Sequence, residues 1–516
     1  MRIRRLNPDI LFQSEHLSRG LAQKTARGGV TTLTAQGLQF LIQTGSTMIL
    51  ARLLSPTDYG IIEMAAVVIN FLAMFKDAGL SIATIQQEHI THEQISTLFW
   101  FNVLISVGLG LVILASAPLV GLFFKRSELV LVTAALSINF ILGGLTIQHN
   151  ALLQRHMMFQ AQRTILIGSL IAGVIVSIIL AYFGWRYWSL VWGTLTTNVV
   201  QIAQTWFYCR WLPGRIKRGT GVRKMAKFGV DITAFNFINY FARNGDNLLI
   251  GKFIGAEALG LYSKAYAVVY LPVVNIRSPL NSVAFPALSR MQHDCDRFRR
   301  YLREINFALA FLSMPLMAFC VMFPREIILL IFGRQWLGMT TVFRLLAIAG
   351  FSQTVIGSLG MMVLACGQSK LYLKLGIIGT LFALTGFGIG IHWGITGVAA
   401  SFIAVSYLPQ YFLFRMAFRS TPGRFTDFLE PCFFPFIFSW LAVLAPYFFI
   451  RTRSLSGHIV LLGAALTMSA IYTGLFLAVP SSRQQLLKVV AVLTANSKVN
   501  EKLLATVQEE AGITAK

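Results

Sequence analysis

The sequence predicts an all-α integral membrane protein with about 14 transmembrane helices, in which two six-helix lobes form a parallel repeat and two further helices are appended. Three observations predict this fold. The chain of 516 residues is 55% hydrophobic and only 12% charged, with a mean hydropathy of +0.66, whereas soluble domains carry about 25% charged residues. Apolar segments of membrane-spanning length recur along the whole chain. A stretch near the N-terminus also matches one that lies 200 residues later.

The predicted spans are continuous apolar segments of about the 20 residues that a helix needs to cross a bilayer. Membrane β-barrels give a weaker signal that alternates over about ten residues, so these segments favour helices. The segments are 30–54, 59–75, 97–122, 128–147, 164–183, 187–208, 228–251, 258–283, 305–323, 337–364, 374–391, 393–414, 432–450 and 457–479.

The distribution of Lys and Arg predicts the orientation of these spans. With the N-terminus placed inside, 31 of the 44 basic residues fall in cytoplasmic segments and 9 in outer loops, and the other 4 lie within or at the ends of spans. This bias follows the positive-inside rule and predicts that both termini are cytoplasmic. It also accounts for the net charge of +24, so we expect no nucleic acid as a partner.

The same alternation divides the chain into parts. The predicted parts are a basic cytoplasmic N-tail (1–27), an N-lobe with the first six helices (28–208), a basic cytoplasmic linker (209–227), a C-lobe with the next six helices (228–418), the two appended helices (419–480) and a cytoplasmic C-tail (481–516). Because six is an even number, both lobes enter the membrane in the same direction, and we expect parallel repeats.

A stripe of polar side chains occurs at the start of both lobes. When Lys24–Val68 is set over Lys224–Val268 without a gap, eight residues are identical. The polar positions also correspond, since Gln36 meets Asn236, Gln39 meets Asn239 and Gln43 meets Arg243. Lipid cannot hydrogen-bond such side chains, so they must face protein or water. The stripes predict a polar cavity between the halves, as in a transporter; the alternative is hydrogen bonding that holds neighbouring helices together.

Arg243 and Asp246 are the strongest candidates for binding. Arg243 lies near the middle of its apolar segment, where an arginine costs about 2.5–3.5 kcal/mol on insertion scales. Its guanidinium would suit an oxygen-rich anion such as phosphate. Asp246 lies three residues further on, so it could hold Arg243 while no substrate is bound, or bind a coupling proton or cation. The alternative is an inert internal ion pair.

Four more candidates lie on the eighth and tenth spans. Lys264 and Tyr270 are expected to line the same space, where tyrosines can stack on sugar rings. Arg277 lies towards the inner end and Arg344 falls within the tenth span. The alternatives are that tyrosines anchor at the interface and that cations reach lipid phosphates. The candidate substrate-binding residues are Gln36, Gln39, Gln43, Asn236, Asn239, Arg243, Asp246, Lys264, Tyr270, Arg277 and Arg344.

No pattern typical of an enzyme is visible. The eight histidines and five scattered cysteines form no metal-ligand motif, and no Walker motif for ATP is present. We therefore expect no cofactor and no bound metal, and consider coupling to an H⁺ or Na⁺ gradient.

Several motifs resemble the bacterial polysaccharide exporters of the multidrug/oligosaccharidyl-lipid/polysaccharide (MOP) superfamily, and particularly Wzx-type flippases for colanic acid and related exopolysaccharides. The motifs are ARLLSPTDYGIIEMA (51–65), DAGLSIATIQQ (77–87), NLLIGKFIGAEALGLYSKAYAVVYLPV (247–273), FPALSRMQ (285–292) and IFGRQW (331–336). The resemblance covers residues 25–480.

The resemblance implies a MOP/MATE-like fold that moves an undecaprenyl-diphosphate-linked oligosaccharide from the inner to the outer leaflet of the bacterial inner membrane. The lobes would rock in alternating access, and the diphosphate would bind near Arg243. The product would serve exopolysaccharide, capsule or O-antigen assembly. Expected partners are the lipid-linked oligosaccharide, membrane lipids, and the polymerase and chain-length proteins of polysaccharide assembly.

Two other functions are open to this sequence. A MATE-like antiporter for cations or drugs would need an acidic, apolar cavity, whereas the visible stripes carry more amides and cations than carboxylates. A membrane enzyme of polysaccharide synthesis would be expected to expose a catalytic loop, and the predicted outer loops are short. We therefore expect a transporter that performs no covalent chemistry.

Overall fold

The computed structural model describes residues 21–76, 80–87, 90–216, 240, 244–452 and 457–494, and no β-strand occurs within these ranges. The chain forms two compact units. Unit 1 comprises the described residues up to Leu261 together with Ile331–Gln335, and unit 2 comprises Tyr262–Leu330 and the described residues from Trp336 onwards. The all-α membrane fold class is therefore confirmed.

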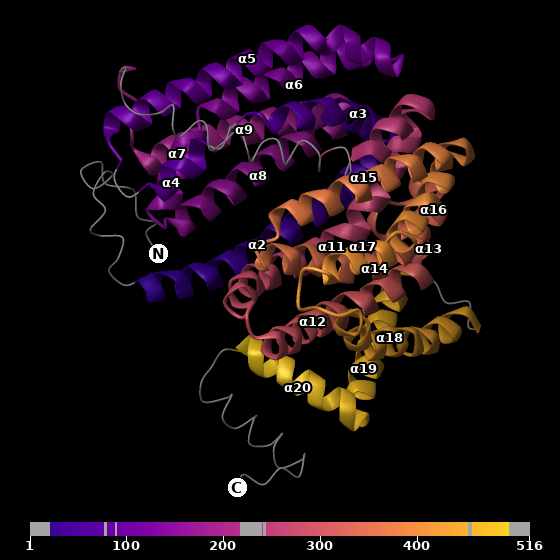
Figure 1. The fold of residues 1–516 in the computed structure, drawn as a ribbon. Helices are drawn as coiled ribbons and strands as arrows, with labels where there is room; N and C mark the ends of the chain where they lie inside the picture. The colour runs from indigo at the N-terminus through magenta and orange to yellow at the C-terminus, as the bar shows by residue number, and fades with distance from the viewer. Residues whose placement is uncertain are drawn as a thin grey trace. The chain divides into compact units, whose positions relative to one another are not determined.

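Unit 1 contains eight named helices and the start of a ninth, and Figure 1 shows them in indigo to magenta. They are α2 (Leu21–Leu53), α3 (Pro56–Ala73), α4 (Leu80–Gln86), α5 (His92–Phe124), α6 (Glu128–Gly144), α7 (Ile147–Arg155), α8 (Phe159–Tyr182), α9 (Tyr187–Cys209) and the first residues of α11 (Ala256–Arg290). Residues 244–253 are also helical. Helix α5 packs on α6, α8 packs on α9, and α2 packs on α8.

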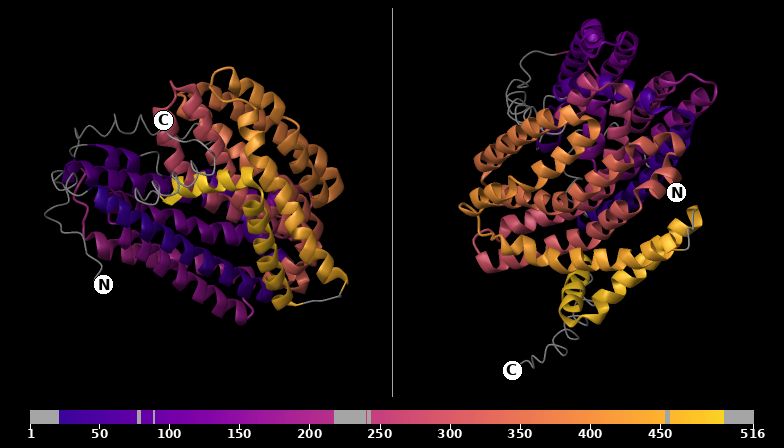
Figure 2. Two further views of the ribbon diagram at one scale, coloured as in Figure 1. Left: turned by 90° about the horizontal axis from the view of Figure 1, so that it is seen from below. Right: turned by 90° about the vertical axis from the view of Figure 1, so that its right-hand side faces the viewer.

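Unit 2 contains the rest of α11 and the later helices, except that the last residue of α13 and the first two of η2 belong to unit 1. They are α12 (Cys295–Met322), α13 (Pro324–Ile331), η2 (Arg334–Met339), α14 (Thr340–Ala365), α15 (Ser369–Gly390), η3 (Ile391–Trp393), α16 (Gly394–Tyr407), α17 (Gln410–Phe418), α18 (Thr426–Thr452), α19 (His458–Ala478) and α20 (Pro480–Thr494). Helix α12 packs on α14 and α18, and α20, in yellow in Figure 2, lies against α12 and α19.

A described helix overlaps every predicted span. Most of 228–251 lies outside the described residues, and only its end, from residue 244, is described as helix. Eight of the described helices are long and apolar enough to cross a membrane, or nine if the bent pair α6 and α7 counts as one span. The number of fourteen spans stays a prediction. The predicted span 393–414 is two helices, α16 and α17, with a break before Pro409, because proline lacks the N–H that a continuous helix requires.

One end of unit 1 is held together by polar contacts of aromatic side chains, of which Trp211 and His149 are buried. The Trp211 indole N–H donates to Nδ1 of His92 at 3.1 Å, and the Trp100 indole N–H donates to the carbonyl of Gly214 at 2.9 Å. Nε2 of His149 lies 3.1 Å from the carbonyl of Trp211. Residues 210–216, which begin the predicted linker, are therefore docked on α5 and α7.

Candidate transport site

The three glutamines of the first stripe lie on one face of α2 in unit 1. At 100° per residue Gln36, Gln39 and Gln43 fall within about 60° of arc. Gln36 is exposed, and Gln39 and Gln43 are half-buried. Leu38 and Leu41, which are 46% and 66% exposed, lie on a different face of α2. The helix therefore presents a polar face and a separate apolar face.

Not every polar residue of the first stripe is equally available to a ligand. The hydroxyls of Ser46 and Thr47 donate to the carbonyl of Gln43 at 2.9 and 2.7 Å. Such bonds satisfy the hydroxyls within their own helix. The side-chain amides of the glutamines are therefore the better candidates for contact with a passenger.

Most of the second stripe falls outside the described residues, including Asn236, Asn239 and Arg243. Asp246 is described and is 3% exposed, and its Oδ1 accepts a hydrogen bond from the backbone N–H of Asn247 at 2.8 Å. A buried carboxylate in an apolar helix can bind a proton or cation, and this role stays a prediction.

Tyrosines form a ladder along α11 in unit 2. The Tyr266 ring is stacked on that of Tyr270 with centroids 4.3 Å apart, and it also faces Tyr262 at 6.4 Å. The Phe402 ring of α16 meets Tyr270 edge-on at 5.8 Å. Tyr270 is 7% exposed. Its ring therefore contributes to packing between α11 and α16, in addition to the predicted contact with sugar.

Arg277 is held against a glycine on α14. A Cβ added at Gly357 would lie 2.2 Å from Nη1 of Arg277 and 2.8 Å from its Cδ. A carbon atom cannot approach so closely, so a methyl group added at Gly357 would displace the Arg277 side chain from this position. The close approach places the Arg277 side chain against α14.

The three candidate cations of unit 2, Lys264, Arg277 and Arg344, lie at two heights along the helix axes. Val269 and Arg277 of α11 lie beside Gly350 and Gly357 of α14 respectively, so the two helices run parallel in near-constant register. Lys264 therefore lies at the level of Arg344, whose Nε donates to the carbonyl of Val321 at 3.3 Å. Arg277 is thirteen residues beyond Lys264, or about 20 Å at 1.5 Å per residue. The structure thus places Arg277 well apart from the other two cations.

Two polar residues of unit 1 were missed in the sequence analysis. Nζ of Lys76 lies so close to Gly143 that an added Cβ there would be 1.7 Å away, and it is 5.5 Å from the centroid of the Phe140 ring. Arg155 is 8% exposed, and its guanidinium donates to the carbonyl of Thr84 at 3.1 Å at the end of α4. Lys76 directly follows the predicted span 59–75, and Arg155 lies between the spans 128–147 and 164–183. The charge pattern therefore indicates loop residues and gives no sign of their burial.

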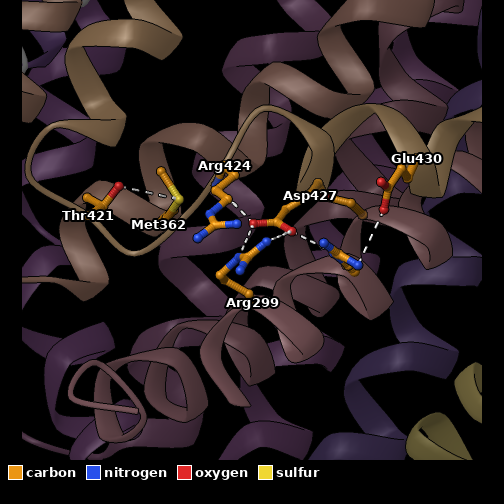
Figure 3. A network of polar contacts seen from close by, with 8 residues as sticks. Arg299, Met362, Thr421, Arg424, Asp427 and Glu430 are labelled. Carbon is orange, nitrogen blue, oxygen red and sulfur yellow. Dashed lines mark hydrogen bonds and ion pairs between the residues drawn. The ribbon is translucent and has the colours of Figure 1, made fainter. Parts of the chain in front are cut away.

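A network of charges joins the starts of α12 and α18 in unit 2 (Figure 3). The buried carboxylate of Asp427 accepts hydrogen bonds from Arg299 at 2.9 and 3.3 Å, from Arg303 at 2.5 Å and from the backbone N–H of Arg424 at 2.9 Å. Burial acts to raise the pKa of Asp427, but these hydrogen bonds outweigh it and hold the pKa below its usual value. The same hydrogen bond raises the pKa of Arg299. Glu430, at 3.3 Å from Arg303, extends the network.

The fold is that of known membrane transporters. Lipid II flippase MurJ in an inward closed conformation superposes with a TM-score of 0.67 at 14% identity, covering 85% of this chain and 96% of that one. An inward-facing multidrug resistance MATE family transporter of the MOP superfamily gives a TM-score of 0.55 at 14% identity, covering 77% of this chain and 94% of that one. The predicted MOP-like fold is therefore confirmed.

Relatives in sequence belong to polysaccharide synthesis. The teichuronic acid biosynthesis protein TuaB of Bacillus subtilis is 29% identical over 58% of this chain, and the match spans 63% of the length of TuaB. The lipopolysaccharide biosynthesis protein WzxC of Escherichia coli is 23% identical over 83% of this chain and 88% of its own. The succinoglycan biosynthesis transport protein ExoT of Rhizobium meliloti is 27% identical over 61% of this chain and 63% of its own. The family described as polysaccharide biosynthesis protein matches residues 49–341, more than half of the sequence. The chain therefore belongs to this family of polysaccharide biosynthesis proteins.

Proposed function

We propose that this protein flips an undecaprenyl-diphosphate-linked oligosaccharide from the inner to the outer leaflet of the bacterial inner membrane, by alternating access and without covalent chemistry. Family membership supports a role in polysaccharide synthesis, and the fold shared with MurJ supports movement of a lipid-linked sugar. Assembly of exopolysaccharide, capsule or O-antigen would use the product, with polymerase and chain-length proteins as partners.

One observation carries the chemical part of the proposal, namely the close packing of Arg277 against Gly357 on an apolar helix. A guanidinium offers several N–H donors in a fixed fork that matches phosphate oxygens. In a medium of low dielectric constant, its charge would offset that of the diphosphate. Gln36, Gln39 and Gln43 would meet sugar hydroxyls, and Arg243 would supply a second cation.

Asp246 would couple transport to an ion gradient. Its carboxylate is buried within an apolar helix, where an ionised carboxylate is costly and a bound proton or cation would offset its charge. H⁺ and Na⁺ are the two candidates, and no other cofactor is required.

The decisive experiment follows a labelled undecaprenyl-diphosphate oligosaccharide in vesicles that contain the purified protein. Leaflet-resolved quenching should show the label crossing in wild-type vesicles and remaining in one leaflet in vesicles without protein. No crossing above the protein-free rate, under an imposed H⁺ or Na⁺ gradient, would overturn the proposed function.

The fold likeness to MATE transporters favours one alternative, a cation or drug antiporter. Expression in a pump-deficient strain separates the two functions. An antiporter would increase drug resistance, whereas the flippase would leave resistance unchanged and would restore polymer in a strain that lacks its own flippase.

A further inference from the structure

Two helix starts cross reciprocally within unit 1. The first is Pro56–Gly60 at the start of α3, and the second is Ala256–Gly260 at the start of α11; together we name them the crossed turns. A Cβ added at Gly60 would lie 1.7 Å from the carbonyl oxygen of Ala256, and a Cβ added at Gly260 would lie 1.9 Å from that of Pro56. Each glycine therefore meets the residue that begins the other turn. Pro56 and Ala256 are 200 residues apart, as are Gly60 and Gly260. The contact therefore joins positions that correspond in the predicted internal repeat.

The absence of side chains is what permits this crossing. Backbones approach closely only where both helices carry small residues. Gly60, Ala256 and Gly260 are all buried. The contacts that an added methyl group would meet are backbone atoms, which cannot move aside as a flexible side chain can.

Two further contacts, which we name the latches, flank the crossed turns, and each joins one predicted repeat to the other. The Gln335 amide, from the second half of the sequence, donates to the carbonyls of Ala51 and Leu54 at 2.6 and 3.0 Å, at the end of α2. In the opposite sense, Nζ of Lys252 donates to the carbonyl of Phe123 near the end of α5 and lies 4.2 Å from the centroid of its ring. Carbonyls at helix ends lack partners in their own helix. Each latch therefore satisfies carbonyls of one repeat with a side chain from the other.

The two latches also use turns of the same kind. Lys125 follows α5 with φ 55°, and Gly333 follows α13 with φ 95°. Arg52, which corresponds to Lys252 in the repeat, lies against Gly333, where an added Cβ would be 3.8 Å from its Cγ. The end of α2 is thus covered by the turn between α13 and α14, and the end of the helix 244–253 is covered by the turn between α5 and α6.

We propose that the crossed turns and the two latches form the outer gate of the transport path, and that Gly60 and Gly260 allow this gate to shut. The inference rests on the proposed function, because alternating access requires an outer end that closes and opens. The charge bias of the loops places these helix ends on the outer side. The latches suit a gate because the one or two hydrogen bonds that each side chain, exposed at least in part, donates to end carbonyls can break and re-form without repacking a core.

The test measures how fast an impermeant maleimide reacts from outside with Leu54→Cys, in a background that lacks the five natural cysteines. Leu54 is 2% exposed beside the Gln335 latch, so the shut gate should protect it. Gly60→Ala and Gly260→Ala should each increase the rate at least tenfold, because the added methyl group forces the backbones apart. Gly45→Ala is the matched control, since its added Cβ meets no described atom within 4 Å, and it should leave the rate unchanged.

A second pair of variants distinguishes an opened gate from a misfolded protein. Gln335→Leu and Lys252→Met remove the latches without adding bulk between the crossed turns, and both should also raise the labelling rate at unchanged protein level and melting temperature. Unchanged labelling in all four variants, while wild-type protein still flips lipid, would overturn the gate. Raised labelling with no flipping by wild-type protein would leave the gate standing and overturn the proposed function instead.

Discussion

At the scale of single residues, the contact between Gly357 and Arg277 tests whether the position of the Arg277 guanidinium matters for flipping. Gly357→Ala should push the guanidinium out of position and reduce flipping about tenfold or more, the effect of losing a charge-assisted hydrogen bond worth about 1.5–3 kcal/mol. Gly379→Ala on α15 is the control, because its added Cβ meets no described atom within 4 Å. Equal initial rates of flipping in the two variants would remove Arg277 from the substrate path.

Arg243 supplies the second prediction at this scale. We expect Arg243→Ala to abolish polymer export and Arg243→Lys to retain part of it, since lysine keeps the charge but loses the bidentate fork. Export is measured as cell-surface polymer in a strain without its own flippase, with membrane levels of each variant determined in parallel. Normal output from Arg243→Ala at the wild-type protein level would refute this role.

At the scale of elements, the carboxylate of Asp427 connects α12 to α18. Asp427→Asn leaves Arg299 without its charged partner in a buried site, so it should lower the free energy of unfolding by about 3 kcal/mol. Glu430→Gln is the matched control, because the Glu430 side chain is 59% exposed and such pairs contribute about 0–1 kcal/mol. Thermal unfolding in detergent should therefore show a clear loss for the first variant and almost none for the second.

The pH dependence of this connection follows from the lowered pKa of Asp427. A carboxylate whose pKa is lower in the folded than in the unfolded protein stabilises the fold fully above the unfolded value of about 4. The stabilisation disappears only as the pH falls through the lower folded value. Between pH 5 and 8, the difference in melting temperature between wild type and Asp427→Asn should therefore stay constant; a difference that vanishes at pH 5 would contradict the charge network.

At the scale of the whole molecule, the charge bias predicts that both termini are cytoplasmic. A fluorescent protein fused after Lys516 should fluoresce, and alkaline phosphatase at the same position should be inactive, because the phosphatase works only outside the cytoplasm. The reverse pattern would invert the chain and place the proposed gate on the inner side. Fusions after each predicted span would also determine whether there are fourteen.

Sequence by itself determined the membrane-helical class, the places of most helices and the family, because apolar length acts locally along the chain and the family motifs can be read directly from it. It also marked Arg277 as a cation on an apolar helix. Only the tertiary structure decided which residues that are distant in the sequence meet one another. Examples are the contacts of Arg277 with Gly357, of Gly60 with Ala256 and of Gln335 with the end of α2. The physical reason is that periodicity shows which face of a helix is apolar but not which helix packs there. For a glycine, moreover, only the structure shows which atom lies where a side chain would otherwise be.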